Sequence, residues 1–277
     1  MIVNRKNLIE DIYPKSWIED IRNRSSQEFD VLQFRNLQHF KHYVKEMKPN
    51  KEGASHKRPT SFQDALSDLM KGVPVFDTST YPNVYDEVRS VLHRKGLVSD
   101  EVYEDYEYDT EGEIIDIAKY IEGNPECMLR PKHAYTNYFY ELYISMAHLA
   151  GVGDSEMMEG LARILATVQL LEKQHIYIKI TVVTCSSDVV QGERTQLVLL
   201  PLYSHKDEKT IEEMSSVLND RFFRIFTFGI KEDMYKEKLY KGYGVTIDLS
   251  DTIIPHHIDV VVLAQNILDK TIVPGSR

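Results

Sequence analysis

The alternation of apolar and other side chains between residues 176 and 182 constrains the fold of this chain more than any other feature. Every second position there is a branched aliphatic residue, in the order Ile176, Ile178, Ile180 and Val182. A period of two residues is the pattern of a β-strand. A second apolar run, Thr195–Tyr203, follows a loop, Cys185–Arg194, that holds no apolar helix. The two runs therefore predict an antiparallel pair of strands.

Helical patterns stand on either side of this pair. We expect a long helix capped by Ser155, with apolar residues on one side as far as Leu171, and a second helix that begins near Ile211. Three more strands are expected, at Tyr138–Met146, Val245–Leu249 and Asp259–Ala264. The order strand, helix, strand, strand, helix, strand, strand predicts a mixed-sheet, three-layer α/β domain over residues 132–277, with helices on both faces.

The first 131 residues follow a different pattern and predict a mainly helical N-terminal region. One short strand is expected at Asp30–Phe34. The expected helices are Lys15–Asn23, one capped by Asn36, one opened by Ser61 with Asp64 and ended by Gly72, one through Val84–Leu92 ended at Gly96, and Ile114–Ile121. We therefore place a boundary near residue 132.

Charge is sorted along this N-terminal region. The chain as a whole has a net charge of −10, yet Arg35–Arg58 holds seven basic residues against two acidic ones. The basic residues are Arg35, Lys41, Lys45, Lys48, Lys51, Lys57 and Arg58. With Phe34, Phe40 and Tyr43 interleaved, the segment predicts a site for single-stranded nucleic acid, in which lysines contact phosphates and aromatic rings stack on bases.

A structural interpretation of the same segment stays open. Phe40, Tyr43, Val44 and Met47 are spaced as i, i+3, i+4 and i+7, which is the apolar face of a helix. On that interpretation the aromatic rings belong to the core, and the lysines form the solvated face of the same helix.

The segment from Asp100 to Glu122 has the opposite charge, with ten acidic residues and Lys119 as its single basic one. Tyr103, Tyr106 and Tyr108 lie within it, spaced for one face of a strand or for a flexible patch. Because tyrosine is enriched at protein interfaces, these three residues are candidates for binding a partner. A surface loop that only keeps the protein soluble is the alternative.

The predicted strand order, with an antiparallel third strand at the edge, resembles the von Willebrand factor A fold. That resemblance implies an Asp-x-Ser-x-Ser metal motif at the end of the first strand, but the segment Ile144–Leu149 lacks the aspartate and the serine spacing. It therefore implies a domain of this type without its metal. Three short segments, Thr60–Leu66, Tyr120–Met128 and Ala147–Gly151, are similar to an uncharacterised family of bacteriophage proteins. This second resemblance implies a phage protein that acts in the cytoplasm of the infected host.

No motif of comparable strength points to catalysis. The chain has neither a phosphate-binding loop nor a dinucleotide fingerprint, and its two cysteines, Cys127 and Cys185, lack metal-ligand spacing. Oxygen and nitrogen ligands cluster near the C-terminus, as Asp248, Ser250, Asp251, His256, His257 and Asp259. Asp-Leu-Ser-Asp is equally good turn chemistry. We therefore expect no catalytic residue, no metal and no cofactor.

Two functions follow from these observations. The first is a non-enzymatic accessory protein that binds single-stranded nucleic acid and assists a phage or host polymerase or replication complex. The alternative is an adaptor that docks a partner ATPase or a host protein through residues 100–113. The apolar runs are too short to span a membrane, and Met1–Lys6 has no signal-peptide core, so we expect a cytoplasmic protein.

Overall fold

The computed structural model describes most of the chain. The described residues are 2–3, 15–24, 28–47, 62–72, 78–99, 106–112, 114–131, 138–146, 153–187, 189, 194–218, 223–235 and 244–271.

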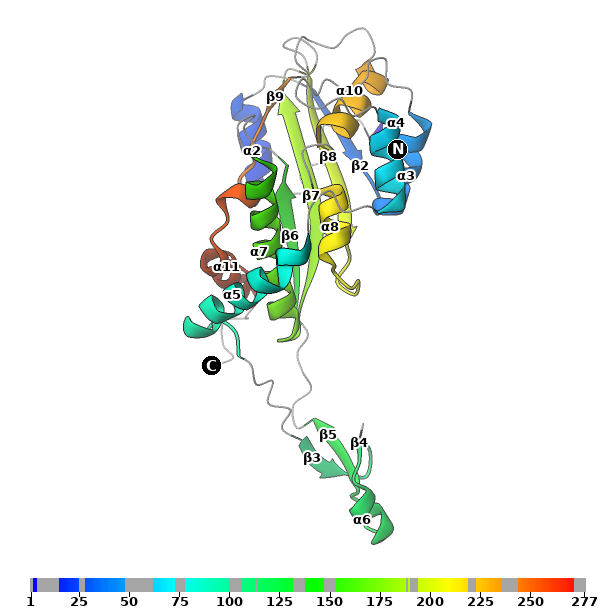
Figure 1. Ribbon diagram of the computed structural model, residues 1–277, viewed down its shortest axis with the longest axis vertical. Coiled ribbons are helices and arrows are strands. Elements are labelled where there is room, and N and C mark those ends of the chain that lie inside the picture. The colour runs from blue at the N-terminus through cyan, green and yellow to red at the C-terminus, as the bar shows by residue number, and fades with distance from the viewer. Residues whose placement is uncertain are drawn as a thin grey trace.

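A mixed β-sheet forms the centre of the molecule (Figure 1). Its strands run in the order β1-β2-β8-β7-β6, and β9 pairs with the end of β7. The pairs β2–β8 and β6–β7 are parallel, whereas β7–β8, β1–β2 and β7–β9 are antiparallel. The bounds are β1 Ile2–Val3, β2 Glu28–Gln33, β6 Tyr138–Ser145, β7 Ile176–Ser187, β8 Arg194–Tyr203 and β9 Val245–Thr246. The antiparallel β7–β8 pair expected from the sequence is thus confirmed.

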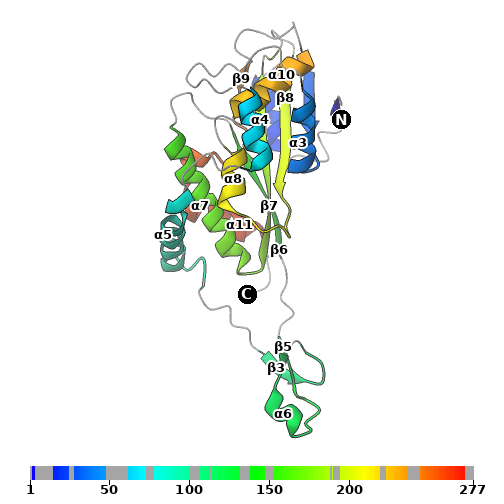
Figure 2. The same ribbon diagram turned by 45° about the vertical axis from the view of Figure 1, so that its right-hand side comes forward.

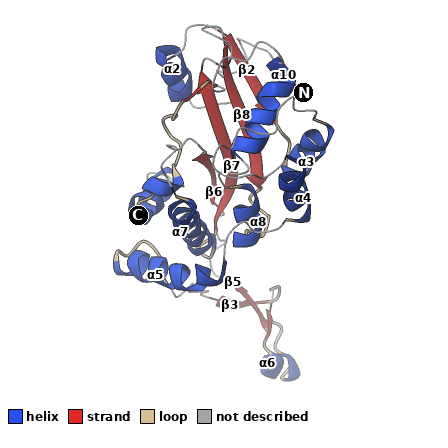
Figure 3. Cartoon of the chain, turned by 45° about the horizontal axis from the view of Figure 1, so that its top comes forward, coloured by secondary structure: helices blue, strands red, loops and turns tan. Residues whose placement is uncertain are grey.

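Most helices lie on one side of this sheet, and α2 (Lys15–Arg24) packs on the other (Figures 2 and 3). The helices of the first side are α3 Leu37–Glu46, α4 Phe62–Lys71, α5 Tyr81–Arg94, α7 Asp154–Glu172, α8 Ile211–Val217, α10 Phe228–Tyr235 and α11 Val260–Thr271. Shorter turns complete the fold: 3-10 helices at Thr78–Thr80 and Pro255–His257, and one π-helical turn at Phe223–Thr227.

The two-residue period of β7 produces these layers. Ile178 and Ile180 point into the large core beneath α7 and α8. Val183 and Cys185 point to the opposite face, where they pack with Trp17 of α2. Successive side chains of a strand alternate between the two faces of a sheet. A strand with apolar residues at both odd and even positions is therefore buried on both faces. The expected mixed-sheet, three-layer α/β fold is confirmed.

Local signals at the ends of helices hold as well. Asn36 caps α3, because its side-chain oxygen accepts a hydrogen bond from the backbone N–H of His39 at 2.9 Å. Gly72 and Gly96 follow α4 and α5 with φ of +65° and +68°. Few residues other than glycine adopt this left-handed conformation readily. Ser155 does not cap α7, whose N-cap is Gly153.

The strand expected at Asp259–Ala264 is wrong, because these residues begin helix α11. The apolar run continues in a helical period, so that Val260, Leu263, Ala264 and Ile267 are buried on one face. Asp259 precedes the helix, and its Oδ1 accepts hydrogen bonds from the N–H groups of Val261 and Val262. The capping aspartate and the buried period outweigh the strand preference of three successive valines.

The antiparallel strand β8 is also not at the edge of the sheet, since β2 pairs with it in parallel along six residues. The resemblance to the von Willebrand factor A fold was based on an antiparallel strand at the edge of the sheet, whereas β8 lies between β2 and β7. The pairing also joins the two regions expected on either side of residue 132, because β2 comes from the first and β8 from the second. The sheet is therefore not confined to residues 132–277.

Residues 106–131 form a small unit that lies apart from the large sheet in both views (Figures 1 and 2). It contains a three-stranded sheet in the order β3-β5-β4 and the short helix α6. The bounds are β3 Tyr106–Asp109, β4 Ile114–Ile115, α6 Ile117–Ile121 and β5 Met128–Pro131. The single helix expected at Ile114–Ile121 is thus corrected, because Asp116 separates a two-residue strand from a five-residue helix.

Among the described residues, no helix combines the length and the apolar character needed to cross a bilayer.

Candidate functional site

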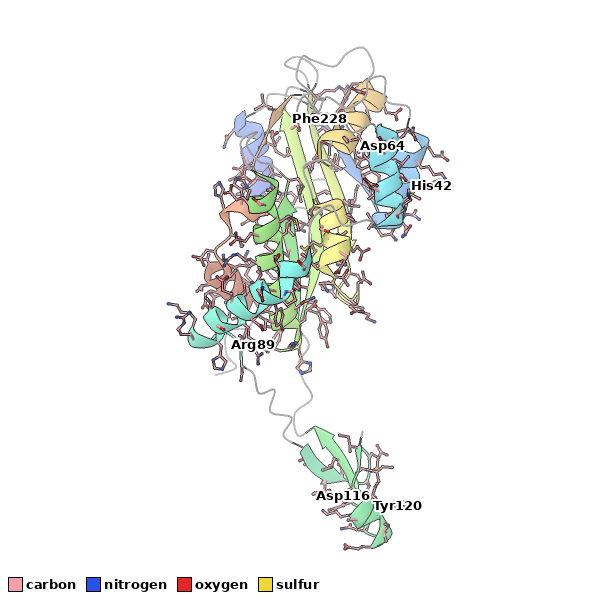
Figure 4. All side chains as sticks on the ribbon, viewed as in Figure 1. His42, Asp64, Arg89, Asp116, Tyr120 and Phe228 are labelled. Atoms are coloured by element: carbon pink, nitrogen blue, oxygen red, sulfur yellow. The ribbon has the colours of Figure 1, made fainter. Side chains whose placement is uncertain are left out.

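The small unit exposes apolar side chains that a folded domain would ordinarily bury. Ile117, Tyr120 and Ile121 of α6 are 69%, 66% and 77% exposed. Positions i, i+3 and i+4 share one face of a helix, so these three side chains form an apolar face that is open to solvent. Figure 4 shows Tyr120 on this helix at the far end of the unit. Ile114 and Ile115 of β4 are about half exposed, at 47% and 51%.

This apolar face is concentrated in one part of the molecule. Of the ten large hydrophobic side chains that are exposed among the described residues, six belong to the small unit. They are Tyr108, Ile114, Ile115, Ile117, Tyr120 and Ile121. Single exposed hydrophobic residues are normal on protein surfaces, whereas a cluster marks a binding surface.

The unit that carries the exposed apolar residues is acidic. Residues 106–131 contain seven acidic and two basic side chains, a net charge of −5. Asp116 organises part of this charge: its Oδ1 caps α6 by accepting from the N–H groups of Ala118 and Lys119, at 3.0 and 3.2 Å. Its Oδ2 accepts a hydrogen bond from the hydroxyl of Tyr108 at 2.8 Å. The carboxylate therefore ties β3 to the start of α6.

Tyr108 is the one predicted partner-binding tyrosine whose side chain is described. Its ring is 44% exposed, and the Lys119 ammonium lies 3.0 Å from the ring centroid. The hydrogen bond to Asp116 raises the pKa of Tyr108 and lowers the pKa of the Asp116 carboxyl, which accordingly stays ionised at neutral pH. Tyr106 begins β3, and Tyr103 lies outside the described residues.

The predicted nucleic-acid residues are described only in part. Arg35 is exposed just before α3, Lys45 is exposed on that helix, and Lys41 is partly buried. The remaining four, Lys48, Lys51, Lys57 and Arg58, lie outside the described residues. His42 is exposed on the same helix and is labelled in Figure 4.

The aromatic residues of this segment belong to the core. Phe34 and Phe40 are each 1% exposed, and their ring centroids lie 4.9 Å apart in an edge-to-face pair. Phe40 also packs edge-on against Phe226, and the partly buried Tyr43 against Phe34. Fully buried rings have no free face for a base, so the core interpretation of Phe34 and Phe40 is confirmed and stacking of bases on these two rings is excluded.

A second feature was not found in the sequence: a row of buried polar side chains across three strands. Asp30 on β2 is the register partner of Gln196 on β8, and Gln196 is also the partner of Ser186 on β7. The three residues are 2–4% exposed. In the next register row on the same face, Leu32, Val198 and Thr184 are buried, and Leu32 and Val198 belong to the apolar core. The face of the sheet thus changes from apolar to polar near the carboxyl end of β7.

Helix α10 covers this row, and three of its side chains reach one member each. Tyr235 donates a hydrogen bond to Asp30 Oδ2 at 2.8 Å, and Lys231 donates to Ser186 Oγ at 2.9 Å. The Gln196 amide contacts the sulfur of Met234 at 3.2 Å. Figure 4 shows Phe228, the first residue of α10, over the same end of the sheet. A π-helical turn, Phe223–Thr227, precedes this helix.

The charges in this buried row are held at close range. Arg194 Nη1 donates to both oxygens of Asp30, at 2.9 and 3.1 Å. Burial raises the pKa of Tyr235, and the Asp30 charge raises it further, so the phenol stays protonated as a donor. Burial lowers the pKa of Lys231 to about 7, against a smaller opposing effect of Cys185. At neutral pH this amine is therefore partly unprotonated.

The oxygen ligands considered for a metal take part in a structural turn. Asp251, with φ of +64°, accepts a hydrogen bond from Ser16 Oγ, and the indole of Trp17 donates to the carbonyl of Ser250. The N–H of Ser250 donates to Asp20 Oδ2 at 2.6 Å. The turn interpretation of residues 248–251 is confirmed, since its polar groups anchor α2. In the described part of the chain, no three potential metal ligands of the His, Cys, Asp or Glu types lie together, and Cys127 and Cys185 are buried free thiols.

These features define a mixed α/β protein with a buried polar row beneath α10 and a small acidic unit with an apolar face. The chain belongs to the family described as Domain of unknown function (DUF7192), whose model matches residues 21–268. The match crosses residue 132 and includes both β2 and β8. Comparisons with curated proteins and with solved structures gave no match.

Proposed function

We propose that this protein is a protein-binding adaptor and that residues 106–131 are its docking unit. The observation that carries the proposal is the open apolar face of Ile117, Tyr120 and Ile121 on α6. Covering one fully exposed isoleucine side chain contributes about 1.5–3 kcal/mol. Two such residues and a tyrosine on one face are enough for the centre of a small interface.

The partner we propose is a protein segment that carries both apolar and basic side chains. The net charge of −5 on the unit repels another acidic surface and attracts Lys and Arg. The carboxylates of the same unit would supply the polar rim of such an interface. The same charge disfavours a nucleic-acid ligand at this unit, because phosphates would face carboxylates.

Fluorescence anisotropy with the full chain tests this proposal. The probe is a short labelled amphipathic peptide built from Lys and Leu, and the control peptide replaces each Lys with Glu. We expect the basic peptide to bind and the acidic one not to. The double variant Ile117→Ser/Ile121→Ser should weaken binding about tenfold or more.

A matched variant separates this face from any exposed apolar residue. Val262→Ser removes a side chain that is 53% exposed on α11, far along the chain from the unit, and should leave binding unchanged. Equal binding of both peptides, or equal binding by the Ile117→Ser/Ile121→Ser variant, would refute the proposed docking face. A labelled single-stranded oligonucleotide that binds more tightly than the basic peptide would favour the nucleic-acid function instead. Self-association of the free chain through α6 would point to a second copy as the occupant.

A further inference from the structure

We propose that the outer edge of strand β6, over residues 138–142, pairs with the same edge of a second copy of the chain. The two large sheets would then join into one continuous sheet. This dimer contact is separate from the docking unit of residues 106–131 and rests on the geometry of the large sheet. Strand β6 is the last in the order β1-β2-β8-β7-β6, with β7 as its neighbour (Figures 1 and 3).

The backbone groups of β6 alternate between β7 and the outer side of the sheet. The N–H of Tyr138 donates to the carbonyl of His175 at 3.0 Å, and the N–H of Met146 donates to the carbonyl of Val183 at 2.9 Å. The even-numbered residues of β6 therefore direct their N–H and C=O groups toward β7. The odd-numbered residues direct the same groups outward, as successive residues of a strand do.

Part of this outer edge already pairs with an extended residue. The N–H of Ile253 donates to the carbonyl of Tyr143 at 2.9 Å, and its carbonyl accepts from the N–H of Ser145 at 2.8 Å. The outward groups of Phe139 and Glu141 have no such partner among the described residues. An edge with unpaired N–H and C=O groups is a template for another strand.

An aromatic cluster lies beside these unpaired groups. Phe139 is 60% exposed and lies on the face of the sheet opposite the large core. Its ring stacks on that of Tyr177 with centroids 5.9 Å apart, and the ring of His205 meets it edge-on at 5.1 Å. Because neighbouring rings already hold Phe139 in place, covering it costs little side-chain entropy.

The charge of this edge favours a second copy as the occupant. The chain has a net charge of −10, so two copies repel each other at most surfaces. At this edge Glu141 is neutralised by Lys179, whose Nζ lies 2.6 Å from its carboxylate, and Thr181 donates to the same carboxylate at 3.2 Å. Lysine and proline commonly protect edge strands from such pairing, and β6 contains neither.

The edge is also its own complement in the antiparallel direction. When Phe139 lies opposite Glu141 of the second copy, each of the two residues exchanges both of its backbone hydrogen bonds with the other. The twofold axis repeats this exchange, so all the outward groups of both residues are satisfied. The two Phe139 rings become diagonal neighbours, which are within reach of each other for aromatic side chains. Pairing over residues 138–142 ends before Ile253 on each copy.

Sedimentation velocity of the full chain, from about 1 to 100 μM, tests this contact. We expect a monomer–dimer equilibrium that salt shifts toward the dimer, because salt screens the repulsion between the acidic surfaces. Phe139→Lys places a protecting lysine at the edge and should weaken dimerisation about tenfold or more. Val245→Lys makes a matched change at a side chain that is 63% exposed on β9, and it should leave dimerisation unchanged.

A disulfide trap locates the contact. In the proposed register Tyr140 lies opposite Tyr140 of the second copy, as a pair without hydrogen bonds and with the short Cα distance that a disulfide requires. Tyr140→Cys should therefore form a disulfide-linked dimer on mild oxidation. Val245→Cys should not, and neither should the wild type, whose two cysteines are buried.

A chain that stays monomeric over the whole concentration range would overturn the proposal. A dimer that Phe139→Lys leaves unchanged, or that gives no disulfide through position 140, would do the same. Loss of the dimer in Ile117→Ser/Ile121→Ser would place the contact on α6 instead. If a monomeric chain binds an uncharged extended peptide and Phe139→Lys abolishes that binding, the occupant of the edge is a strand of another protein and the second copy is excluded.

Discussion

Gly160 of α7 lies directly against the backbone carbonyl of Pro255. A Cβ at position 160 would be 1.9 Å from the Pro255 oxygen and 2.5 Å from its carbonyl carbon. Both obstacles are backbone atoms, which cannot rotate away as a side chain can. The absence of a side chain at Gly160 therefore allows the Pro255–His257 turn to pack on α7.

Gly160→Ala should consequently destabilise the fold even though alanine favours helices. We expect the free energy of unfolding to fall by about 1–3 kcal/mol, the usual cost of forcing extra volume into a packed site. Equilibrium urea unfolding followed by circular dichroism measures it. Glu156→Ala, an exposed change on the same helix, should stay within about 0.5 kcal/mol of wild type. If Gly160→Ala is as stable as this control, the close contact between Gly160 and the Pro255 carbonyl is wrong.

The hydroxyl of Tyr235 should contribute to stability through Asp30. Tyr235→Phe leaves the ring in place but removes the 2.8 Å hydrogen bond to the buried carboxylate. Hydrogen bonds to charged groups contribute about 1.5–3 kcal/mol, and we expect a loss in that range in urea unfolding. Tyr120→Phe removes a hydroxyl from a side chain that is 66% exposed and serves as the control, with no measurable loss. Equal stability of the two variants would contradict a role of this hydrogen bond.

Lys231 should make stability depend on pH in the alkaline range. Its pKa is about 7 in the folded chain, below the ordinary value of 10.5, so between these values the unfolded chain binds more protons. The free energy of unfolding should therefore rise with pH across this window, by at most about 1.4 kcal/mol per pH unit. The penalty for the buried charge is complete below the folded-state pKa and vanishes above the unfolded one.

The variant Lys231→Met isolates this effect from other titrations. The unfolding free energy of the wild type, measured by urea titration from pH 6 to pH 10, should rise relative to that of the variant as the pH rises. A constant difference between the two curves would mean that Lys231 has the same pKa in both states.

Divalent metals should leave the 248–251 turn unchanged. Asp251 already accepts from Ser16, and Asp248 Oδ1 from the hydroxyl of Thr252 at 3.3 Å. Thermal unfolding midpoints should therefore be the same in Ca²⁺, in Mg²⁺ and in a chelator. A saturable increase in the midpoint with either metal, lost in Asp248→Ala, would instead establish a cation site.

The layered fold could be predicted from the sequence because its signals are local. The alternation in β7 and the Asn36 cap of α3 each depend on residues within a few positions of one another. Helix α11 could not be identified in the same way. Three successive valines favour a strand, and the helical period becomes clear only when the burial of Ile267 is known. The pairing of β2 with β8 also has no local signal, since about 160 residues separate the two strands.

The candidate sites also differ in how far local sequence signals could reveal them. The acidic character of residues 100–122 is a property of the sequence, and it led to Tyr108. The exposure of Ile117 and Ile121 depends on the unit lying apart from the core (Figure 1), and apolar residues in a short helix ordinarily predict burial. The polar row beneath α10 requires the register of three strands, so Ser186 and Lys231 could not be paired before the structure was known.

Photo-crosslinking from α6 tests the central claim most directly. A benzophenone side chain is placed at Ile121, and in a second sample at Val262, and each full-length chain is irradiated in a nuclease-treated extract of its source cells. The adaptor function predicts adducts from position 121 alone, on a protein segment that combines Lys or Arg with apolar residues. Adducts equal in number from both positions, or the absence of an adduct from position 121, would contradict it.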